Sequence, residues 1–466
     1  MTTAGPVAAR SWKEQCIDTG RGYFTLATED TGDVPVRLFL TPSLLEQVEH
    51  NVYPQIVTAA RFPGVKLVVI TPDVHIGYGV PVGCAILTDA HSGSIALGPV
   101  GFDIGCGMVS MRSHVPADAA TEERKRAFNK AVMRRIELGP GGRGDRRFAR
   151  IDLGEFERIV RGGAAYYTTT YGDRLERSRA ERDVIPVDDT WQLPRTRADR
   201  GMQQIGSLGG GNHFIELQRG KHADTLFVQV HTGSRGFGHG LAEHYFHVAK
   251  KEQPARIAHL DEAWFAPDSV GRRDYLNAVA AGGNYAIVNR LVISEAIAAA
   301  FKEVFHARLE LVYEISHNLV QREWHPEFGD VWVHRKGATR AFPAGHPQLA
   351  GTPWESTGHP VLIPGSNRDW SYILRPADSA VSGFTVNHGA GRKMSRTAAR
   401  KSLVQSAVDR DYRGAGILVN LDGRVPIDEA GPAYKNSREV VDAVTGAGLA
   451  TIEHELWPLA SVKASA

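Results

Sequence analysis

The chain has 466 residues, of which 42% are hydrophobic and 23% are charged, and its formal net charge is +2. This composition excludes a disordered or fibrous protein, and the nearly balanced charge argues against a protein coated with nucleic acid, so any polyanion has to bind in a local basic groove. Because three cysteines make no disulfide framework and no apolar run is long enough to span a bilayer, the sequence favours a cytoplasmic protein.

Residues 1–40 show no clear pattern and are predicted to form an irregular N-terminal appendage, which leaves residues 41–466 as the catalytic domain. A short apolar run at residues 65–70 lies between two pairs that contain proline, which favours a buried strand. This strand leads into a glycine-rich loop at residues 73–79.

A helix is predicted at residues 122–138, where Phe128, Val132 and Ile136 recur at helical spacing and a Gly-Pro pair follows. The next segment, residues 141–150, is rich in glycine and arginine. A solvated loop is favoured there over an RNA contact, because runs of like charge are usually exposed.

Strands predicted at residues 225–230, 309–315 and 331–333 share one arrangement, since each leads to a histidine in a loop of small or polar residues. The clearest helix, at residues 285–305, has its large apolar residues on one side. Helices and strands alternate without strict βαβ order, so the sequence predicts an α+β fold with a central sheet.

Five residues in these glycine-rich loops could bind metal ions: Asp103, Cys106, His213, His231 and His317. Taken singly, each has a commoner structural role, since a lone cysteine usually fills a core and a lone histidine usually makes a hydrogen bond. Their conjunction favours a metal site with oxygen, sulfur and nitrogen donors, suited to Mn²⁺, Fe²⁺, Co²⁺ or Zn²⁺. Because a thiolate can bridge two ions, a two-metal site for phosphoryl transfer is expected.

His388 is the candidate nucleophile. It lies between Asn387 and Gly389, so small neighbours leave one face of the imidazole open. Arg392 and Arg396 follow at a spacing that could present guanidinium groups to phosphate oxygens. The alternative, a histidine in an ordinary turn, is the commoner fate of such a pattern taken alone.

Together these motifs resemble the RtcB-type RNA-splicing ligases. One matching block is Gly-Phe-Asp-Ile-Gly-Cys-Gly at residues 101–107, and another is His-Gly-Ala-Gly-Arg at residues 388–392. Further blocks, in the same order as in that family, lie at residues 73–83, 209–216, 231–239, 316–318, 333–343 and 361–366. The resemblance implies one large α+β domain with central β-sheets and a metal-binding cleft.

The resemblance also implies the chemistry. Two Mn²⁺ ions would share Cys106, with Asp103 and His213 completing one site and His231 and His317 the other. His388 would be guanylylated by GTP and pass GMP to an RNA 3′-phosphate, giving an RNA-(3′)pp(5′)G intermediate. A 5′-hydroxyl end would then displace GMP, so that 3′-phosphate or 2′,3′-cyclic phosphate ends are joined to 5′-hydroxyl ends.

Further roles are implied residue by residue. The residues implied to bind the guanylate, besides His388, are Asn212, Glu216, Ser366, Ser371, Gly391 and Lys463. The residues implied to bind RNA are Arg235, Lys336, Arg392 and Arg396. The implied partners are RNAs from transfer-RNA splicing or RNA repair, with an accessory activator protein as a further candidate, and no membrane is involved.

One loop departs from the pattern of the family, which has Met-Gly-Thr-Ala where this chain has Asn-Arg-Asp-Trp at residues 367–370. Small residues let backbone N–H groups approach phosphates, so this loop predicts altered nucleotide binding. Two alternatives therefore stay open beside the ligase: an RNA-end-binding protein, and a metal-dependent phosphoesterase that has lost guanylylation.

Overall fold

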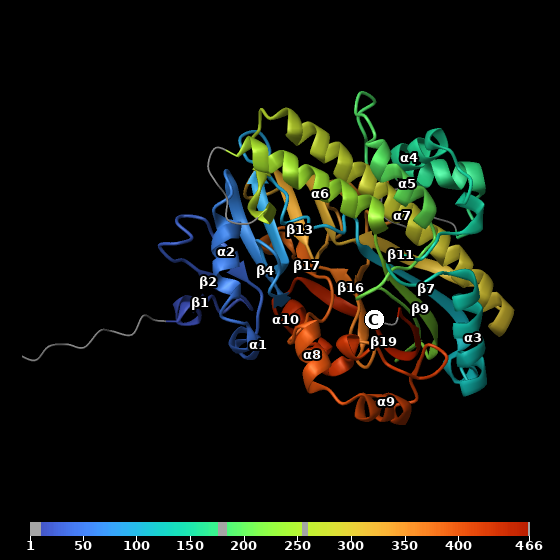
Figure 1. Ribbon diagram of the computed structural model, residues 1–466. Helices are drawn as coiled ribbons and strands as arrows, with labels where there is room; N and C mark the ends of the chain where they lie inside the picture. Colours follow the sequence, from blue (N-terminus) through green and yellow to red (C-terminus); the bar gives the residue numbers. More distant parts are fainter. Residues whose placement is uncertain (1–10, 176–183, 254–259, 465–466) are drawn as a thin grey trace, which may run out of the picture.

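A computed structural model describes residues 11–175, 184–253 and 260–464 (Figure 1). Within this part of the chain, one sheet has seven strands in the order β1-β2-β3-β4-β5-β13-β12. Their bounds are β1 (Cys16–Asp18), β2 (Phe24–Leu26), β3 (Val36–Leu38), β4 (Val65–His75), β5 (Val82–Asp89), β12 (Asn318–His325) and β13 (Gly329–Lys336).

A second sheet has eight strands among the described residues, in the order β11-β7-β9-β8-β19-β16-β15, with β18 paired to β19. Their bounds are β7 (Gly107–Pro116), β8 (Phe214–Gly220), β9 (Thr225–Thr232), β11 (Glu310–Ser316), β15 (Val361–Ile363), β16 (Ser371–Pro376), β18 (Leu418–Val419) and β19 (Ala450–Val462). Two small pairs complete the strands: β6 (Ile95–Ala96) with β10 (Trp264–Phe265), and β14 (Ala338–Arg340) with β17 (Thr385–Asn387).

The helices lie around these sheets in two groups (Figure 1). One group surrounds the longest described helix and comprises α3 (Glu122–Arg135), α4 (Leu153–Tyr171), α5 (Arg195–Gln204), α6 (Arg235–Glu252) and α7 (Val270–Phe305). The other helices are α1 (Pro42–Gln47) and α2 (Val52–Ala60) near β4, and α8 (Arg396–Ser402), α9 (Gln405–Gly414) and α10 (Ser437–Gly446) at the end near β19. None of the described helices has the length and apolar composition needed to cross a membrane.

Helix α7 is buried along most of its length because it packs on the eight-stranded sheet and beneath the other helices of its group. Ile293, Ile297 and Phe301 form one hydrophobic core with Val109 of β7 and Val230 of β9. The opposite side contributes to a second core with α4 and α6. Burial of this amount of apolar surface is the main driving force that fixes the helix against the sheet.

Residues 11–40 differ from the sequence prediction. Irregular structure was expected, whereas the described part of this segment forms β1, β2 and β3, and β3 pairs in parallel with β4. Phe24, Leu26, Val36 and Leu38 are buried in the core beneath α2. Strands of three residues are too short for an alternating pattern to stand out. The division at residue 40 stays a prediction, and residues 1–10 lie outside the described residues.

The mixed α+β class, with central sheets in one large domain, is confirmed. The ends of four strands of the eight-stranded sheet converge on one region. Cys106 precedes β7, His213 precedes β8, His231 lies in β9, and His317 follows β11. His388 follows β17 of the small sheet. Residues far apart in the sequence are thus placed side by side.

Candidate metal centre and active site

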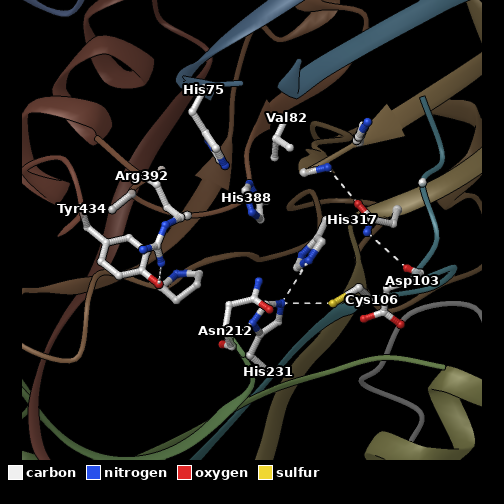
Figure 2. A pocket seen from close by; sticks show the side chains of 18 of the residues that line it. His75, Val82, Asp103, Cys106, Asn212, His231, His317, His388, Arg392 and Tyr434 are labelled. Atoms are coloured by element: carbon white, nitrogen blue, oxygen red, sulfur yellow. Dashed lines mark hydrogen bonds between the residues drawn. The ribbon is translucent and has the colours of Figure 1, made fainter. Parts of the chain in front are cut away.

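Two groups of possible metal ligands share Cys106. Figure 2 shows Asp103, His231 and His317 near it. The Cys106 Sγ atom lies 3.2 Å from Nε2 of His231 and 3.5 Å from Nε2 of His213. His213 Nε2 is 3.1 Å from Oδ2 of Asp103, and His231 Nε2 is 3.2 Å from Nε2 of His317. All five predicted ligands are therefore brought together, with the sulfur between the two groups.

The imidazoles are oriented by the backbone. His213 Nδ1 lies 2.9 Å from the carbonyl oxygen of Leu208, and His231 Nδ1 lies 3.1 Å from that of Asn212. A carbonyl can only accept, so each Nδ1 carries a proton, and each Nε2 faces the other predicted ligands. Backbone contacts of this kind are the usual way in which a protein fixes a histidine ligand.

The environment of these donors fits a bound cation. Burial lowers the pKa of both His231 and His317 far below the ordinary value, so both rings are neutral. Burial and the Asp103 carboxylate raise the pKa of the Cys106 thiol. His317 Nδ1 is buried without a hydrogen-bond partner in the described part of the chain. Metal ions bound by sulfur and imidazole donors would satisfy this set.

A buried arginine connects the segments that carry these ligands. Arg290 of α7 is fully buried, and its guanidinium donates to the carbonyl oxygens of Gly105 (2.6 Å) and Thr232 (3.3 Å). It also donates to Ser316 Oγ at 2.9 Å and pairs with Glu314 at 2.8 Å. Gly105, Thr232 and Ser316 are the direct neighbours of three of the predicted ligands. One side chain therefore connects the loops that carry the predicted metal ligands, and no periodicity in the sequence indicated it.

His388 is held by a buried carboxylate. Its Nδ1 donates to Oδ2 of Asp73 at 2.6 Å, and the backbone N–H groups of His388 and Gly389 donate to the same oxygen at 3.1 and 3.2 Å. Thr71 Oγ1 donates to the other oxygen at 2.6 Å. Burial alone would raise the pKa of Asp73, but these interactions, led by that with His388, lower it, so the carboxylate is ionised. In the neutral tautomer that this contact favours, Nδ1 carries the proton and Nε2 keeps the lone pair.

The sequence analysis gave Asp73 no role of its own. It was expected in the glycine-rich loop after the first predicted strand, whereas it lies near the end of β4, and its partner is distant in the sequence. Gly391 shows why the backbone can come so close. It has a φ of 76°, and a Cβ atom there would overlap the carbonyl oxygen of Asp73. The two loops therefore meet only because glycine is present.

A cavity of about 440 Å³ opens beside His388. Residues predicted to bind guanylate line it, namely Asn212, Glu216, Ser366, Gly391 and Lys463, together with Phe214, Glu429 and Tyr434, which the sequence analysis did not single out. Burial raises the pKa of Glu216 to about 7. Ser371 does not line the cavity, since its hydroxyl accepts the N–H of Gly365 and the amide of Gln218 and so supports the loop from behind.

Comparison with known proteins identifies the family. Residues 55–464 match the family described as tRNA-splicing ligase RtcB. The chain belongs to the RtcB family. It is 33% identical to a tRNA-splicing ligase RtcB of Pyrobaculum aerophilum, over 92% of this chain and 95% of that protein. It is 35% identical to an RNA-splicing ligase RtcB of Mycobacterium tuberculosis, over 88% of this chain and all of that protein. An RtcB tRNA-splicing ligase of Archaeoglobus fulgidus is 32% identical over 92% of this chain.

Membership of the RtcB family confirms the resemblance based on the motifs. The loop that departs from the pattern of that family is accommodated outside the cavity. Arg368 pairs with Asp411 at 2.9 Å, and Asp369 Oδ2 accepts the N–H of Ser437 at 2.9 Å. Trp370 lies against Trp457. Of the four changed residues only Asn367 lines the cavity, so most of the added bulk lies outside it.

The four residues predicted to bind RNA in the RtcB-like site differ in position. Lys336, Arg392 and Arg396 line the cavity, whereas Arg235 lies outside its lining and donates to Ser207 Oγ (3.3 Å) and the carbonyl oxygen of Gly139 (3.1 Å). The role of Arg235 in RNA binding stays a prediction.

Two buried acids hold the other arginines. Glu429 accepts from Arg392 at 3.2 Å and from Arg396 at 2.8 Å, and Asp428 accepts from Arg400 at 2.8 Å. The side chain of Arg396 remains 43% exposed, whereas that of Arg392 is 16% exposed. Arg396 is therefore better placed to reach a phosphate without leaving its partner.

Proposed function

We propose that this chain is a GTP- and Mn²⁺-dependent RNA ligase that joins RNA 3′-phosphate or 2′,3′-cyclic phosphate ends to 5′-hydroxyl ends. The observation that carries the proposal is the contact of Asp73 with Nδ1 of His388. With the proton on Nδ1, Nε2 keeps a lone pair for attack, at a cavity that is also lined by four of the five predicted metal ligands and by most of the predicted guanylate-binding residues. Membership of the RtcB family, whose relatives are named as RNA-splicing ligases, supports it.

The first step uses the imidazole. Nε2 of His388 attacks the α-phosphorus of GTP, a P–N bond forms, the α–β phosphoanhydride bond breaks and pyrophosphate leaves. As the ring becomes cationic, the Asp73 carboxylate stabilises it through the Nδ1–H hydrogen bond, in the manner of the carboxylate of a catalytic triad.

The later steps transfer the nucleotide and seal the RNA. An oxygen of the RNA 3′-phosphate attacks the guanylate phosphorus, and the P–N bond breaks, which gives RNA-(3′)pp(5′)G. The 5′-hydroxyl of the second end then attacks the RNA phosphorus, and GMP leaves. An end that carries a 2′,3′-cyclic phosphate must first be opened by water to a 3′-phosphate.

The predicted ligands would hold two Mn²⁺ ions, with Cys106 shared between Asp103 and His213 on one side and His231 and His317 on the other. When bound, such ions neutralise negative charge on phosphoryl oxygens. Glu216 would accept N–H groups of the guanine edge, and Lys336 and Arg396 would bind RNA phosphates. The RNAs of transfer-RNA splicing and of RNA repair carry the ends that this site would accept.

The test is incubation with α-labelled GTP and Mn²⁺, followed by a denaturing gel, beside the His388→Ala variant. A label that is stable to alkali, labile to acid and lost in the variant is expected, since a histidine phosphoramidate has these properties. A wild-type protein that takes no label from GTP would contradict the proposal. Metal-dependent RNA binding would then indicate an RNA-end-binding protein, and GTP-independent phosphate release a phosphoesterase.

A further inference from the structure

One aromatic side chain at the cavity has no role in the chemistry above. Large hydrophobic side chains are exposed at six positions in the described part of the chain: Ile17, Ile76, Tyr78, Val270, Trp324 and Val404. Tyr78 is the most exposed of them, at 75%, and of these six it alone lines the cavity beside His388. Because an exposed aromatic ring gains free energy when it is covered, its position at the mouth of the cavity favours a ligand that covers it.

The ring is exposed although the backbone around it is fixed. The side-chain amide of Gln55 accepts the N–H of Gly77 at 3.0 Å and donates to its carbonyl oxygen at 2.7 Å. Lys336 Nζ donates to the carbonyl oxygens of Tyr78 at 2.6 Å and of Val80 at 3.2 Å. Gly77 also has no room for a Cβ atom, which would overlap the carbonyl oxygen of Val80. The loop therefore presents the ring from a rigid support, which lowers the entropy cost of binding.

The loop belongs to a different part of the cavity wall from the predicted guanylate-binding residues. His75 and Val82 flank the loop, and Figure 2 shows both of them above His388, while Asn212, one of the predicted guanylate-binding residues, lies below it. Lys336, whose ammonium group holds the loop, is itself among the residues implied to bind RNA phosphates. Tyr78 therefore lies next to an ammonium group that is implied to bind phosphates of the RNA backbone.

We infer that the ring of Tyr78 stacks on the terminal base of one of the two RNA ends that are to be joined, and so holds that end beside His388. The inference rests on the proposed function and adds to it a contact to the base. Single-stranded RNA ends expose the faces of their bases, and aromatic side chains recognise them by stacking. Every base has such a face, so this contact orients the end without selecting its sequence.

The experiment measures RNA binding and guanylylation separately. Fluorescence anisotropy with a labelled 3′-phosphorylated oligonucleotide, and with a labelled 5′-hydroxyl oligonucleotide, gives the affinity for each end. Tyr78→Ala is expected to weaken binding of one end roughly 5- to 150-fold, the range for the loss of one base–aromatic stack. Tyr78→Phe and Tyr78→Trp keep a ring and should bind within about twofold of the wild type. Labelling of His388 by GTP should be unchanged in all three.

The matched control is Trp324→Ala, which removes an exposed aromatic side chain of β12 that does not line the cavity. It should bind both oligonucleotides like the wild type. Oligonucleotides whose terminal nucleotide lacks its base identify the stacked end. If Tyr78 stacks on that base, the wild type and Tyr78→Ala should bind the abasic oligonucleotide with equal affinity. Either the 3′-phosphate end or the 5′-hydroxyl end can fulfil this expectation.

Two results would overturn the inference: equal RNA binding by the wild type and Tyr78→Ala, or a defect of Tyr78→Ala confined to labelling by GTP, which would place the ring against the nucleotide instead. Because RNA binding does not require guanylylation, the two proposals fail separately. Absence of the GTP label with a Tyr78-dependent RNA affinity refutes only the ligase proposal. A wild-type label with no effect of Tyr78 on either RNA end refutes only the stacking contact.

Discussion

In the proposed function, Asp73 determines which nitrogen of His388 is available for attack. Asp73→Asn would keep an acceptor for the backbone N–H groups but could donate an amide N–H to Nδ1, which moves the ring proton to Nε2. We expect guanylylation to fall about 10²- to 10⁴-fold, as for loss of the carboxylate that orients a catalytic histidine. The rate of labelling by α-labelled GTP measures this effect.

Thr71→Val is the matched control for that substitution. It removes the 2.6 Å hydrogen bond to the other oxygen of the Asp73 carboxylate and leaves the oxygen that holds His388 untouched. It should reduce labelling by less than about tenfold, the equivalent of one hydrogen bond. If Asp73→Asn were labelled as fast as Thr71→Val, the proposal that Asp73 orients the His388 ring would be contradicted.

If Glu216 binds guanine as proposed, we expect the site to depend on pH. Its pKa is raised to about 7 by burial, and only the ionised carboxylate can accept two N–H groups from guanine. Protonation below that pH therefore competes with binding, and affinity for guanosine should fall about tenfold between pH 8 and pH 6. Guanosine is preferred to GTP because it has no phosphate that titrates in this range.

Calorimetric titration with guanosine at several pH values would test this dependence. Glu216→Gln should bind guanosine weakly and with no change between pH 6 and pH 8, since its amide does not titrate there. A wild-type affinity that is equally independent of pH would refute the assigned role of Glu216.

Single residues could be predicted where the donor chemistry itself is informative. Asp103, Cys106 and the three histidines were recognised because their side chains share one property, the ability to bind a cation in a glycine-rich loop. The contact of Asp73 with His388 could not be predicted, because it joins residues 315 positions apart that no local pattern connects. The roles of the predicted ligands stay predictions, although the structure brings them together.

Among the elements, α7 connects the hydrophobic core to the metal-binding loops through Arg290. Arg290→Met would leave Glu314 as a buried charge without its guanidinium partner, which typically costs about 3–5 kcal/mol of stability. It would also release the neighbours of three predicted metal ligands. We expect denaturant unfolding at a lower concentration and weaker binding of Mn²⁺ in a calorimetric titration.

A second substitution separates these two effects. In Arg290→Met/Glu314→Leu the buried charge is gone, so much of the stability should return. Affinity for Mn²⁺ should stay low, because the hydrogen bonds to Gly105, Thr232 and Ser316 are still missing. Wild-type metal affinity in the double variant would show that Arg290 acts on stability alone.

The elements show where local patterns suffice. The strand expected at residues 65–70 and the helix expected at 122–138 are present as β4 and α3, with ends that differ by a few residues. Helix α7 begins fifteen residues before its predicted start at 285. Gly282 and Gly283 lower the helix propensity just before residue 285, yet Gly282 faces Ile104, where a Cβ atom would come within 3.0 Å. Close packing with the loop that carries Asp103 and Cys106, which depends on the tertiary structure, thus overrides helix propensity.

At the scale of the whole molecule, the α+β class and the single large domain follow from the sequence, but the pairing of strands does not. Residues 11–40 illustrate the reason. Their strands are stable because β3 lies beside β4 and buries Leu38 against α2, contacts that form only in the folded chain. The cavity likewise requires loops from both large sheets and from the small sheet that carries His388.

The separation of the predicted metal ligands in the sequence has a thermodynamic consequence. Asp103 and Cys106 are neighbours, but His317 is more than two hundred residues away, so an unfolded chain cannot assemble the set. An ion that binds only the native state raises the free energy of unfolding, and the increase grows with the logarithm of the ion concentration. At a concentration one hundred times the dissociation constant, the increase is about 2.7 kcal/mol.

The midpoint of thermal unfolding should therefore rise steadily as Mn²⁺ is added and fall with a chelator. His317→Ala, which lacks one ligand, should show a much smaller rise, and an equal rise in both proteins would place the stabilising ion elsewhere. If the wild type behaves as expected, the folded lifetime of this protein in a cell depends on how much free metal the cell supplies.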